Sequence, residues 1–440
     1  MSGNARTKSA SALAPAPRAA GMRADLVRRL ARVLETAEHA LDRLAADGWT
    51  DPTDASRSVR PETVVSETAR LLLAVSSVRG EPALARRVDE LARRLAPHAR
   101  GARMRSGLCF EPALALDHAR AHACLRAMGH ADPAFDELLR TATRAQAFAA
   151  RERAPHRALE QRWVAELCGL EGPAGQPPMR ALAAMSALGR PLDLVGANRE
   201  DLHAFTHALM YLKDGRLAPK ALPRPRAEVL RDAEAALVRC LADEDYDLAC
   251  ELLLAWPLTG ARFGGWATLA WRTLAAVEDA AGLLPAPGTR LAHLGRLDER
   301  HRTDALLASA YRTTYVMGLL CAACLASGCL PPAPVREELP PGHGAGGHWA
   351  AIYARLPASE REALGGFVHA VTLHRAVRAR DAAAIHAALD AAAAADVADG
   401  PHWVQAAELL ERLVVHEGAA PARRLRLLRT PSNAGVRSET

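Results

Sequence analysis

Helix-length segments recur in pairs along this chain of 440 residues, and a new pair begins about every 45–60 residues. Apolar residues within each segment follow the three- and four-residue spacing of an amphipathic helix. Alternating runs rich in Val, Ile and Thr, which are typical of strands, are nearly absent. The pattern therefore predicts an all-α protein built from helical hairpins. The first members of the pairs are expected to begin near Glu62, Glu111, Pro155, Arg199, Glu244, Thr303 and Ser359, and the second members near Glu81, Asp132, Pro178, Arg226, Gly265, Gly347 and Asp381.

Helix-capping residues, proline and glycine mark the boundaries of these segments. Asp132-Pro133 combines an N-cap residue with proline at the first helical position. Ser359 and Glu362 have the spacing of a capping box. Glycines that sit where helices should stop are Gly129, Gly169, Gly189, Gly215, Gly260, Gly282 and Gly328.

The rest of the chain flanks this repeat. A single helix from Arg23 to about Ala46 is expected before the pairs, and another over 402–416 after them. The Ala-, Pro- and Ser-rich start has the composition of a disordered arm, and the Arg-rich end that of a solvated tail. The expected organisation is a disordered N-terminal arm (1–21), a helical-repeat domain (22–416, with halves 22–190 and 191–416) and a basic disordered tail (417–440).

Two architectures use such hairpins. In a closed (α/α) toroid, inner helices surround a centre and outer helices cover them, whereas in an open α-solenoid the hairpins stack into a superhelix. Solenoid repeats are usually uniform and span about 34–47 residues. Here the later pairs lengthen through Pro- and Gly-rich insertions at 284–300 and 330–347. The sequence therefore favours the toroid, with the open solenoid as the alternative.

Composition narrows the class of protein. The net charge is only +6 and is not clearly concentrated outside the tail, which argues against nucleic-acid binding. No run reaches the about 18 consecutive apolar residues that a membrane span needs, and the N-terminus lacks the apolar core of a secretory signal. Eight cysteines without a dense framework suggest reduced thiols, so we expect a cytoplasmic protein. Arginine almost to the exclusion of lysine, with abundant alanine, fits a GC-rich and plausibly actinobacterial genome.

The segment 199–214 carries two stripes at helical spacing, one apolar and one polar. If this helix lines a ring, its polar face looks toward the centre. His207 and Asp214 can then move protons, while His203 and Tyr211 can bind a ligand. Surface or hydrogen-bonded histidines are the structural alternative. The apolar stripe comprises Leu202, Phe205, Leu209 and Leu212, and the polar stripe comprises His203, His207, Tyr211 and Asp214.

The histidine spacing also bears on metal binding. His203 and His207 lie four residues apart, as two metal ligands on one helix would, and His118 and His122 repeat the spacing. Two such pairs that met across a toroid would suit a transition metal such as Zn, Cu or Fe. Chance pairs are expected among 17 histidines, so we predict no cofactor and keep this four-histidine site as the alternative.

A third set of candidates lies on the segment that begins near Thr303. Tyr311, Thr314 and Tyr315 fall within it, and all five tyrosines of the chain lie between 211 and 353. Tyrosine combines an apolar ring with a polar tip, so this concentration suggests a wall that binds a ligand. Ordinary core tyrosines are the alternative.

Two acidic positions are also candidates. Glu251 sits in a run of leucines, and a buried carboxylate near a histidine can act as a general acid or base. Glu278 and Asp279 end a long helix, where the helix dipole disfavours acids, so they need partners such as Arg302 or Arg312. Ordinary ion pairs are the favoured explanation of these carboxylates.

A set of short motifs lies between about 199 and 328: Thr206-His207, Tyr211, Asp214-Gly215, Tyr246-Asp247-Leu248-Ala249, Glu251-Leu252-Leu253, Val277-Glu278-Asp279 and the run from Tyr311 to Gly318. With these motifs the segment resembles an uncharacterised family of actinobacterial helical proteins, some of them encoded near natural-product pathways. That resemblance implies no reaction. At fold level only, the hairpin pattern is similar to toroid enzymes such as glycoside-processing enzymes, terpene cyclases and lanthipeptide cyclases.

These observations lead to one expected function and one alternative. We expect a tailoring enzyme of specialised metabolism that acts on a small molecule or peptide in a central helical cavity, with the reaction class and the oligomeric state left open. The alternative is a non-catalytic helical-repeat scaffold that binds a peptide or protein partner. The expected catalytic residues are His207, Asp214 and Glu251, and the expected substrate-binding residues are His203, Tyr211, Glu278, Tyr311, Thr314 and Tyr315.

Overall fold

The fold is seen in a computed structural model that describes residues 17–44, 49–51, 54–173, 175–212, 221–287, 289, 296–334 and 347–416. The regular structure of these residues is helical apart from one short antiparallel hairpin of β1 (Trp49–Asp51) and β2 (Asp54–Val59). The prediction of an all-α protein is confirmed at this level, and the hairpin is an addition that the sequence pattern did not indicate. No helix in the described part of the chain is long and apolar enough to cross a membrane.

The helices begin close to the residues that the sequence indicated. The predicted first members of the pairs are α2 (Pro61–Ser76), α5 (Ala115–Ala127), α7 (Pro155–Cys168), α9 (Arg199–Tyr211), α11 (Tyr246–Leu253) and α15 (Glu299–Ser327). The predicted second members are α3 (Pro82–Ala99), α6 (Pro133–Thr143), α8 (Met179–Met185), α10 (Arg226–Ala242), α13 (Gly265–Ala281), α16 (His348–Ala354) and α19 (Ala382–Ala394). The other helices are α1 (Pro17–Asp42), α4 (Ala102–Phe110), α12 (Ala255–Thr259), α17 (Ala358–Ala363), α18 (Gly365–Arg378) and α20 (Pro401–His416), with 3-10 turns η1 (Pro112–Leu114), η2 (Gln146–Ala149) and η3 (Ala187–Gly189).

The local signals at helix ends are mostly confirmed. Asp132 caps α6 by accepting a hydrogen bond from the amide of Phe135. Left-handed glycines end four of the described helices, because glycine enters that conformation without a steric penalty. The capping box predicted at Ser359 is wrong, since α17 begins one residue earlier and has no side-chain cap. The glycines that end α7, α12, α13 and α15 are Gly169, Gly260, Gly282 and Gly328.

Three differences concern the bounds of elements. α1 begins at Pro17, so the last residues of the predicted disordered arm are helical, and it ends at Asp42 rather than near Ala46. α4 was not predicted as a separate helix. The helix expected from Ser359 is divided into α17 and α18. The predicted basic tail, residues 417–440, lies outside the described residues.

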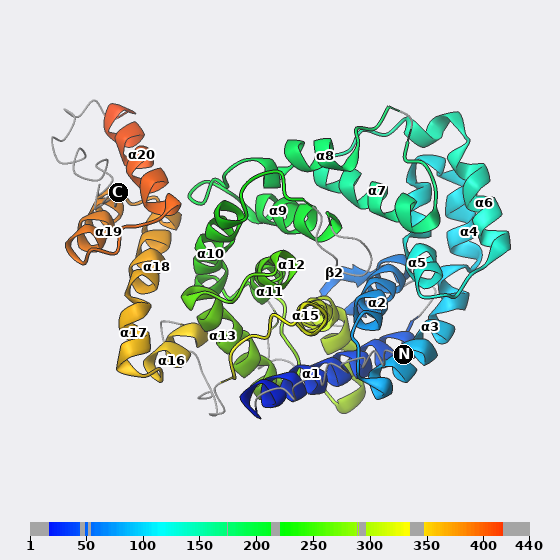
Figure 1. The fold of residues 1–440 in the computed structure, drawn as a ribbon, viewed down its shortest axis with the longest axis horizontal. Helices are drawn as coiled ribbons and strands as arrows, with labels where there is room; N and C mark the ends of the chain where they lie inside the picture. Colours follow the sequence, from blue (N-terminus) through cyan, green and yellow to red (C-terminus); the bar gives the residue numbers. More distant parts are fainter. Residues whose placement is uncertain are drawn as a thin grey trace, which may run out of the picture.

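The first members of the pairs contact one another in chain order. α2 contacts α5, α5 contacts α7, α7 contacts α9, α9 contacts α11, α11 contacts α15, and α15 contacts α2 again. Figure 1 shows these six helices, called the ring helices below, around the middle of the molecule. The ring brings distant segments together: the hydroxyls of Thr68 on α2 and Tyr315 on α15, 247 positions apart, share a hydrogen bond of 3.0 Å.

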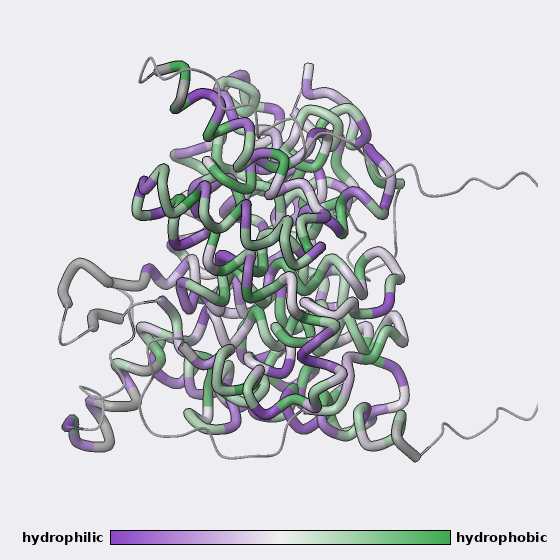
Figure 2. The backbone as a smooth tube through the Cα atoms, turned by 90° about the vertical axis from the view of Figure 1, so that its left-hand side faces the viewer, coloured by the Kyte–Doolittle hydropathy of each residue, from purple (hydrophilic) through white to green (hydrophobic). Residues whose placement is uncertain are grey.

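The other helices pack against the ring from outside. α1 lies on α15, α3 on α2 and α5, α8 on α7, and α10 and α13 on α11. Helices α16 to α20 form a further layer on the side of α10 and α13 (Figure 1). Both hydrophobic and hydrophilic residues recur along the helices in Figure 2, as helices with one packed and one polar face require. α15 packs closely because it has glycine at 318, where a Cβ atom would lie 2.7 Å from side-chain atoms of Leu71 and Val33.

Candidate functional site

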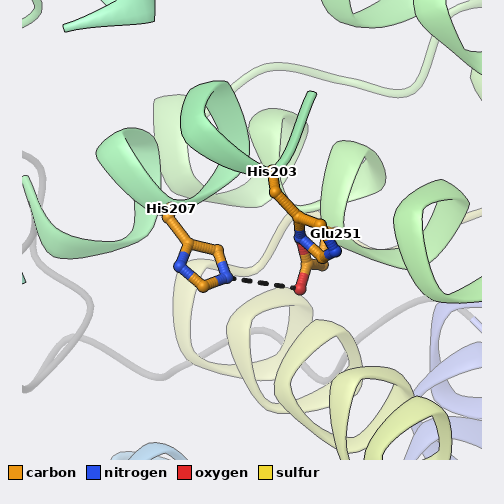
Figure 3. A group of neighbouring side chains, drawn as sticks. All are labelled: His203, His207 and Glu251. Carbon is orange, nitrogen blue, oxygen red and sulfur yellow. Dashed lines mark hydrogen bonds and ion pairs between the residues drawn. The ribbon is translucent and has the colours of Figure 1, made fainter. Parts of the chain in front are cut away.

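Two neighbouring ring helices, α9 and α11, place two imidazoles around one carboxylate. A capping box of Asn198 and Asp201 fixes the start of α9. The apolar side chains of α9 pack into the core, and His203 and His207 lie against Glu251 of α11. Figure 3 shows the three side chains together, with a dashed line joining His207 to Glu251. All three side chains are buried, and Glu251 has no exposed surface.

The contacts of Glu251 differ between its two oxygens. Oε2 lies 3.0 Å from Nδ1 of His203 and accepts a hydrogen bond of 2.6 Å from the hydroxyl of Thr206. Oε1 lies 3.7 Å from Nε2 of His207, which is too far for a hydrogen bond. One oxygen of the carboxylate is therefore fully engaged, while the other retains its capacity to bind.

The proton on His203 can be assigned from its neighbours. Arg199 lies 2.6 Å from Nε2 of His203, and a guanidinium can only donate, so Nε2 accepts. The neutral ring then carries its proton on Nδ1 and donates it to Glu251. Arg199 is held in turn by Asp245 at 2.8 Å and Asp247 at 2.9 Å. A chain of hydrogen bonds thus runs from these carboxylates through Arg199 and His203 to Glu251.

Several buried polar atoms around Glu251 have no hydrogen-bond partner among the described residues. They are Oε1 of Glu251, Nε2 of His207 and Oδ1 of Asp247. Such atoms are uncommon in native proteins, because an unsatisfied buried polar group costs about 1–3 kcal/mol. These three atoms belong to the neighbouring helices α9 and α11; other buried atoms without partners occur elsewhere in the described chain, for example both ring nitrogens of His402.

Arg312 of α15 lies beside Glu251. Its guanidinium lies 3.9 Å from Oε1 of Glu251. The side chain of Arg312 is 43% accessible. Burial by surrounding protein lowers its pKa, but the carboxylates of Asp247 and Glu67 outweigh burial, so the pKa is raised. Solvent therefore comes within a side chain's length of the atoms that lack partners.

The carboxylates of α11 have pKa values that move in opposite directions. Burial opposes the charge of Glu251, but contacts with His203 and His207 outweigh it and hold its pKa well below the usual range. Burial raises the pKa of Asp247, and the nearby charge of Glu251 raises it further. Glu251 is thus ionised at neutral pH. Opposed shifts in adjacent carboxyl groups are typical of functional sites, and also of structural ion-pair networks.

Tyr211 belongs to a second buried network, contributed by α2, α5 and α7. Its hydroxyl donates to Glu160 at 2.7 Å and accepts from Arg70 at 3.2 Å. Arg120 also pairs with Glu160, and Arg70 with Glu67. Burial opposes the charge of Glu160, but Arg120 and Arg157 outweigh it and lower its pKa. The ring of Tyr211 meets that of His207 edge-on, with 5.9 Å between centroids. The network thereby supports one side of His207.

The tyrosines of α15 are buried. The ring of Tyr311 meets that of Tyr315 edge-on at 5.4 Å, and Tyr315 bonds Thr68. Thr314, by contrast, has a hydroxyl without a partner within the described chain. Of the predicted ligand-binding wall, Thr314 therefore retains free bonding capacity, while Tyr315 is engaged with α2.

Glu278 lies in a different cluster from the one predicted. It is buried on α13 and pairs with Arg29 and Arg32 of α1, and the adjacent Asp279 pairs with the same arginines. Arg312, the partner that the sequence suggested, faces Glu251 instead. The reason is that α1 packs alongside this end of α13, which the sequence pattern does not reveal. Asp214, a predicted catalytic residue, lies outside the described residues, as does the side chain of Arg302.

The second histidine pair is engaged elsewhere. His118 lies 2.8 Å from Glu111, and His122 is held by Asp136 at 2.9 Å and by Arg100 at 3.1 Å. Neither belongs to the group in which His203, His207 and Glu251 bring their ligand atoms together. The four-histidine metal site is therefore not formed.

Several charged residues beside the site were missed by sequence reasoning. A signal existed on α2, where Glu67 and Arg70 interrupt an apolar run at a spacing of three and form an ion pair of 2.9 Å. Buried charges on an otherwise apolar helix require partners, so this pair pointed to a polar centre. Arg120 and Glu160 gave no comparable signal, because each lies among other charged residues in the sequence.

One protein family matches this chain over most of its length. The family is described as "Domain of unknown function (DUF6895)", and its model matches residues 30–322. This range includes the ring helices α2, α5, α7, α9 and α11 and most of α15, and it is much wider than the segment 199–328 on which the sequence resemblance rests. No curated protein and no solved structure matches the chain. The chain belongs to the family described as the domain of unknown function DUF6895.

Proposed function

We propose that this protein is an enzyme that acts on a small molecule at the centre of a closed (α/α) toroid. The observation that carries the proposal is the group of buried atoms without partners on His207, Glu251 and Asp247, beside the accessible Arg312. A folded chain tolerates such atoms when a ligand completes their hydrogen bonds. The site therefore has the bonding capacity that a polar ligand would use.

The toroid is inferred from the order of helix contacts. The ring helices contact each other in chain order and return from α15 to α2. In an open solenoid, each hairpin would contact only its neighbours in sequence. Each of the ring helices also contributes a charged or hydroxyl-bearing side chain to the linked networks around His207, Glu251 and Tyr211.

His207 is the side chain best suited to move a proton. Its Nε2 faces the ionised Oε1 of Glu251 across 3.7 Å, and this carboxylate would stabilise the imidazolium that forms when His207 accepts a proton. His203 and Thr206 hold the other oxygen of Glu251 and so fix its orientation. In this proposal His207 is the catalytic base or acid, Glu251 stabilises its charged form, and Arg312 binds the ligand.

The proposed class of substrate is inferred from the sequence alone. A tailoring reaction of specialised metabolism in an actinobacterium, on a small molecule or a peptide in the cytoplasm, is consistent with the composition and with the family resemblance. A non-catalytic scaffold that binds a peptide or protein partner is the alternative. The enzyme hypothesis requires the polar side chains at the centre for function, whereas the scaffold hypothesis does not.

A complementation experiment tests the proposal even while the substrate is unidentified. The gene is deleted in the source organism, and the small-molecule extract is compared by mass spectrometry after complementation with wild type or variants. His207→Gln is expected to leave the metabolite change of the deletion in place, although circular dichroism shows a folded protein. The control His122→Gln, which changes a buried histidine away from the centre, is expected to restore the wild-type extract. Full restoration by His207→Gln would contradict the proposal and favour the scaffold.

A further inference from the structure

His203, His207 and Glu251 have the geometry of a metal-ligand set. Their ligand atoms all lie within 4.8 Å of one another. Two atoms that each lie about 2.1 Å from one ion are about 3.0 Å apart at a right angle and about 3.4 Å apart at a tetrahedral angle. Oε2 of Glu251 lies 3.0 Å from Nδ1 of His203, and Oε1 lies 3.7 Å from Nε2 of His207. Nε2 of His207 has no hydrogen bond within the described chain to give up when it binds an ion.

The unsatisfied atoms of the set are those that a metal ion would use. Nε2 of His207 and Oε1 of Glu251 are both buried and lack hydrogen-bond partners within the described chain. A proton shared between them would need a shorter separation than 3.7 Å, whereas an ion between them would not. We propose that His203, His207 and Glu251 bind a divalent first-row transition-metal ion, of which Zn²⁺ and Fe²⁺ best suit two imidazoles and one carboxylate.

The charges around the site are compatible with a bound cation. Asp245, Asp247 and Glu251 lie close to the site against the guanidinium groups of Arg199 and Arg312. The carboxylates outnumber the guanidinium groups by one, so a cation enters a region with no excess of positive charge. Three protein ligands leave further coordination positions open, which is typical of catalytic rather than structural metal sites.

Arg199 competes with the metal ion for His203. The ion binds Nδ1, so the neutral ring must carry its remaining proton on Nε2, where Arg199 now donates. Histidine ligands usually donate that second N–H to an acceptor, and a guanidinium offers none. The side chain of Arg199 is 38% accessible and keeps Asp245 and Asp247 as partners, so it can withdraw. Replacing Arg199 by glutamine, whose amide oxygen accepts, is therefore expected to tighten metal binding.

This inference concerns the same residues as the proposed function but replaces the proton-moving role of His207, because an Nε2 that binds an ion cannot accept a proton. Its test is therefore separate. The full-length chain, purified without a metal-affinity tag and stripped with a chelator, is titrated with Zn²⁺ and with Co²⁺ by calorimetry. We expect one ion per chain, and visible absorption of Co²⁺ bound to nitrogen and oxygen ligands. Elemental analysis of protein that was never stripped identifies the resident metal. Failure of the wild-type chain to take up either ion in a one-to-one ratio would overturn the proposal.

Three variants locate the ion. His207→Gln is expected to lower affinity by about 100-fold or more, because losing a ligand exceeds the loss of an outer partner. Arg199→Gln is expected to raise affinity by about 10-fold. The control His122→Gln should bind as wild type does. Wild-type affinity in His207→Gln would place the ion elsewhere and sink the inference.

The two proposals fail differently. If the wild-type chain binds no metal but His207→Gln still cannot complement the gene deletion, the metal inference falls and the proposed function stands. If the chain binds one ion through His207 but His207→Gln complements fully, the ion is real and the enzymatic proposal falls.

Discussion

Two buried ionic clusters of this protein differ in what their charges leave unbound. Between α1 and α13, Arg29 bonds Asp25, Glu278 and Asp279, so every nitrogen of its guanidinium is used. At the centre, Glu251 has one oxygen fully engaged and the other without a hydrogen bond, opposite an imidazole nitrogen in the same condition. Burial of charge is common to both. Among the described residues, the α1–α13 cluster leaves one guanidinium nitrogen without a partner, Nε of Arg32, whereas at the centre an imidazole nitrogen and a carboxylate oxygen without partners face each other, which is the difference that marks a candidate site.

The first prediction concerns Arg29, where we expect the largest effect. Arg29→Met should lower the free energy of unfolding by about 3–5 kcal/mol, because it leaves the buried Glu278 without its closest partner. Urea denaturation followed by circular dichroism measures this loss. The control Arg93→Met removes an ion pair that is mostly exposed, and should cost less than about 1 kcal/mol. Equal losses in the two variants would mean that the α1–α13 cluster is not a structural ion cluster.

The second prediction concerns acid stability near the centre. Burial, the charge of Arg157 and the charge of His207 lower the pKa of His156 to about 4. The unfolded chain, with a histidine pKa of about 6.5, therefore binds this proton more readily than the folded chain. The contribution of His156 to stability is fully present above about pH 6.5 and is lost as pH falls toward about 4.

His156→Gln tests that sign. It should reduce the decline of the unfolding free energy between about pH 6.5 and 4, measured by urea denaturation at a series of pH values. The α1–α13 cluster gives no matching effect in this window, because burial raises the pKa of Glu278 rather than lowering it. An unchanged pH profile in His156→Gln would show that His156 is not held neutral beside His207.

The third prediction has the smallest expected effect on stability. His207→Gln should change the free energy of unfolding by less than about 1 kcal/mol, because Nε2 gives up no hydrogen bond. His122→Gln should cost about 1–3 kcal/mol, because His122 is bonded at both ring nitrogens, to Asp136 and Arg100. Thermal unfolding of the two variants gives the comparison. A greater loss for His207→Gln would indicate a structural role for the central imidazole.

Much of the fold could be predicted because its signals are local. Helix starts at Asp132-Pro133 and helix ends at glycines such as Gly169 follow from capping and from backbone conformation within a few residues. The hairpin of β1 and β2 could not be predicted in this way, since its register joins Trp49 to Val59 and its sequence lacks a strong strand pattern. The capping box predicted at Ser359 is wrong because residue spacing alone does not establish a cap: the same spacing also occurs by chance.

The candidate site was predictable only in part. The spacing of His203 and His207 puts both on one face of α9, and a carboxylate among leucines singles out Glu251. Their meeting depends on how α9 and α11 pack, and no local pattern encodes that. The same limit explains Glu278: its place at the end of a long helix indicated that it needs a partner, but only the packing of the helices shows that the partner is Arg29.

The sequence by itself determined which residues form helices and which faces of those helices are polar, because both depend on neighbours within about one or two turns. It also singled out His203, His207 and Glu251 as chemically competent side chains. Tertiary structure alone decided that α15 returns to α2, that Arg199 sets the proton on His203, and that His207 and Glu251 keep unsatisfied atoms facing each other. Those facts depend on contacts between segments far apart in the chain, where packing energy rather than local propensity selects the partner.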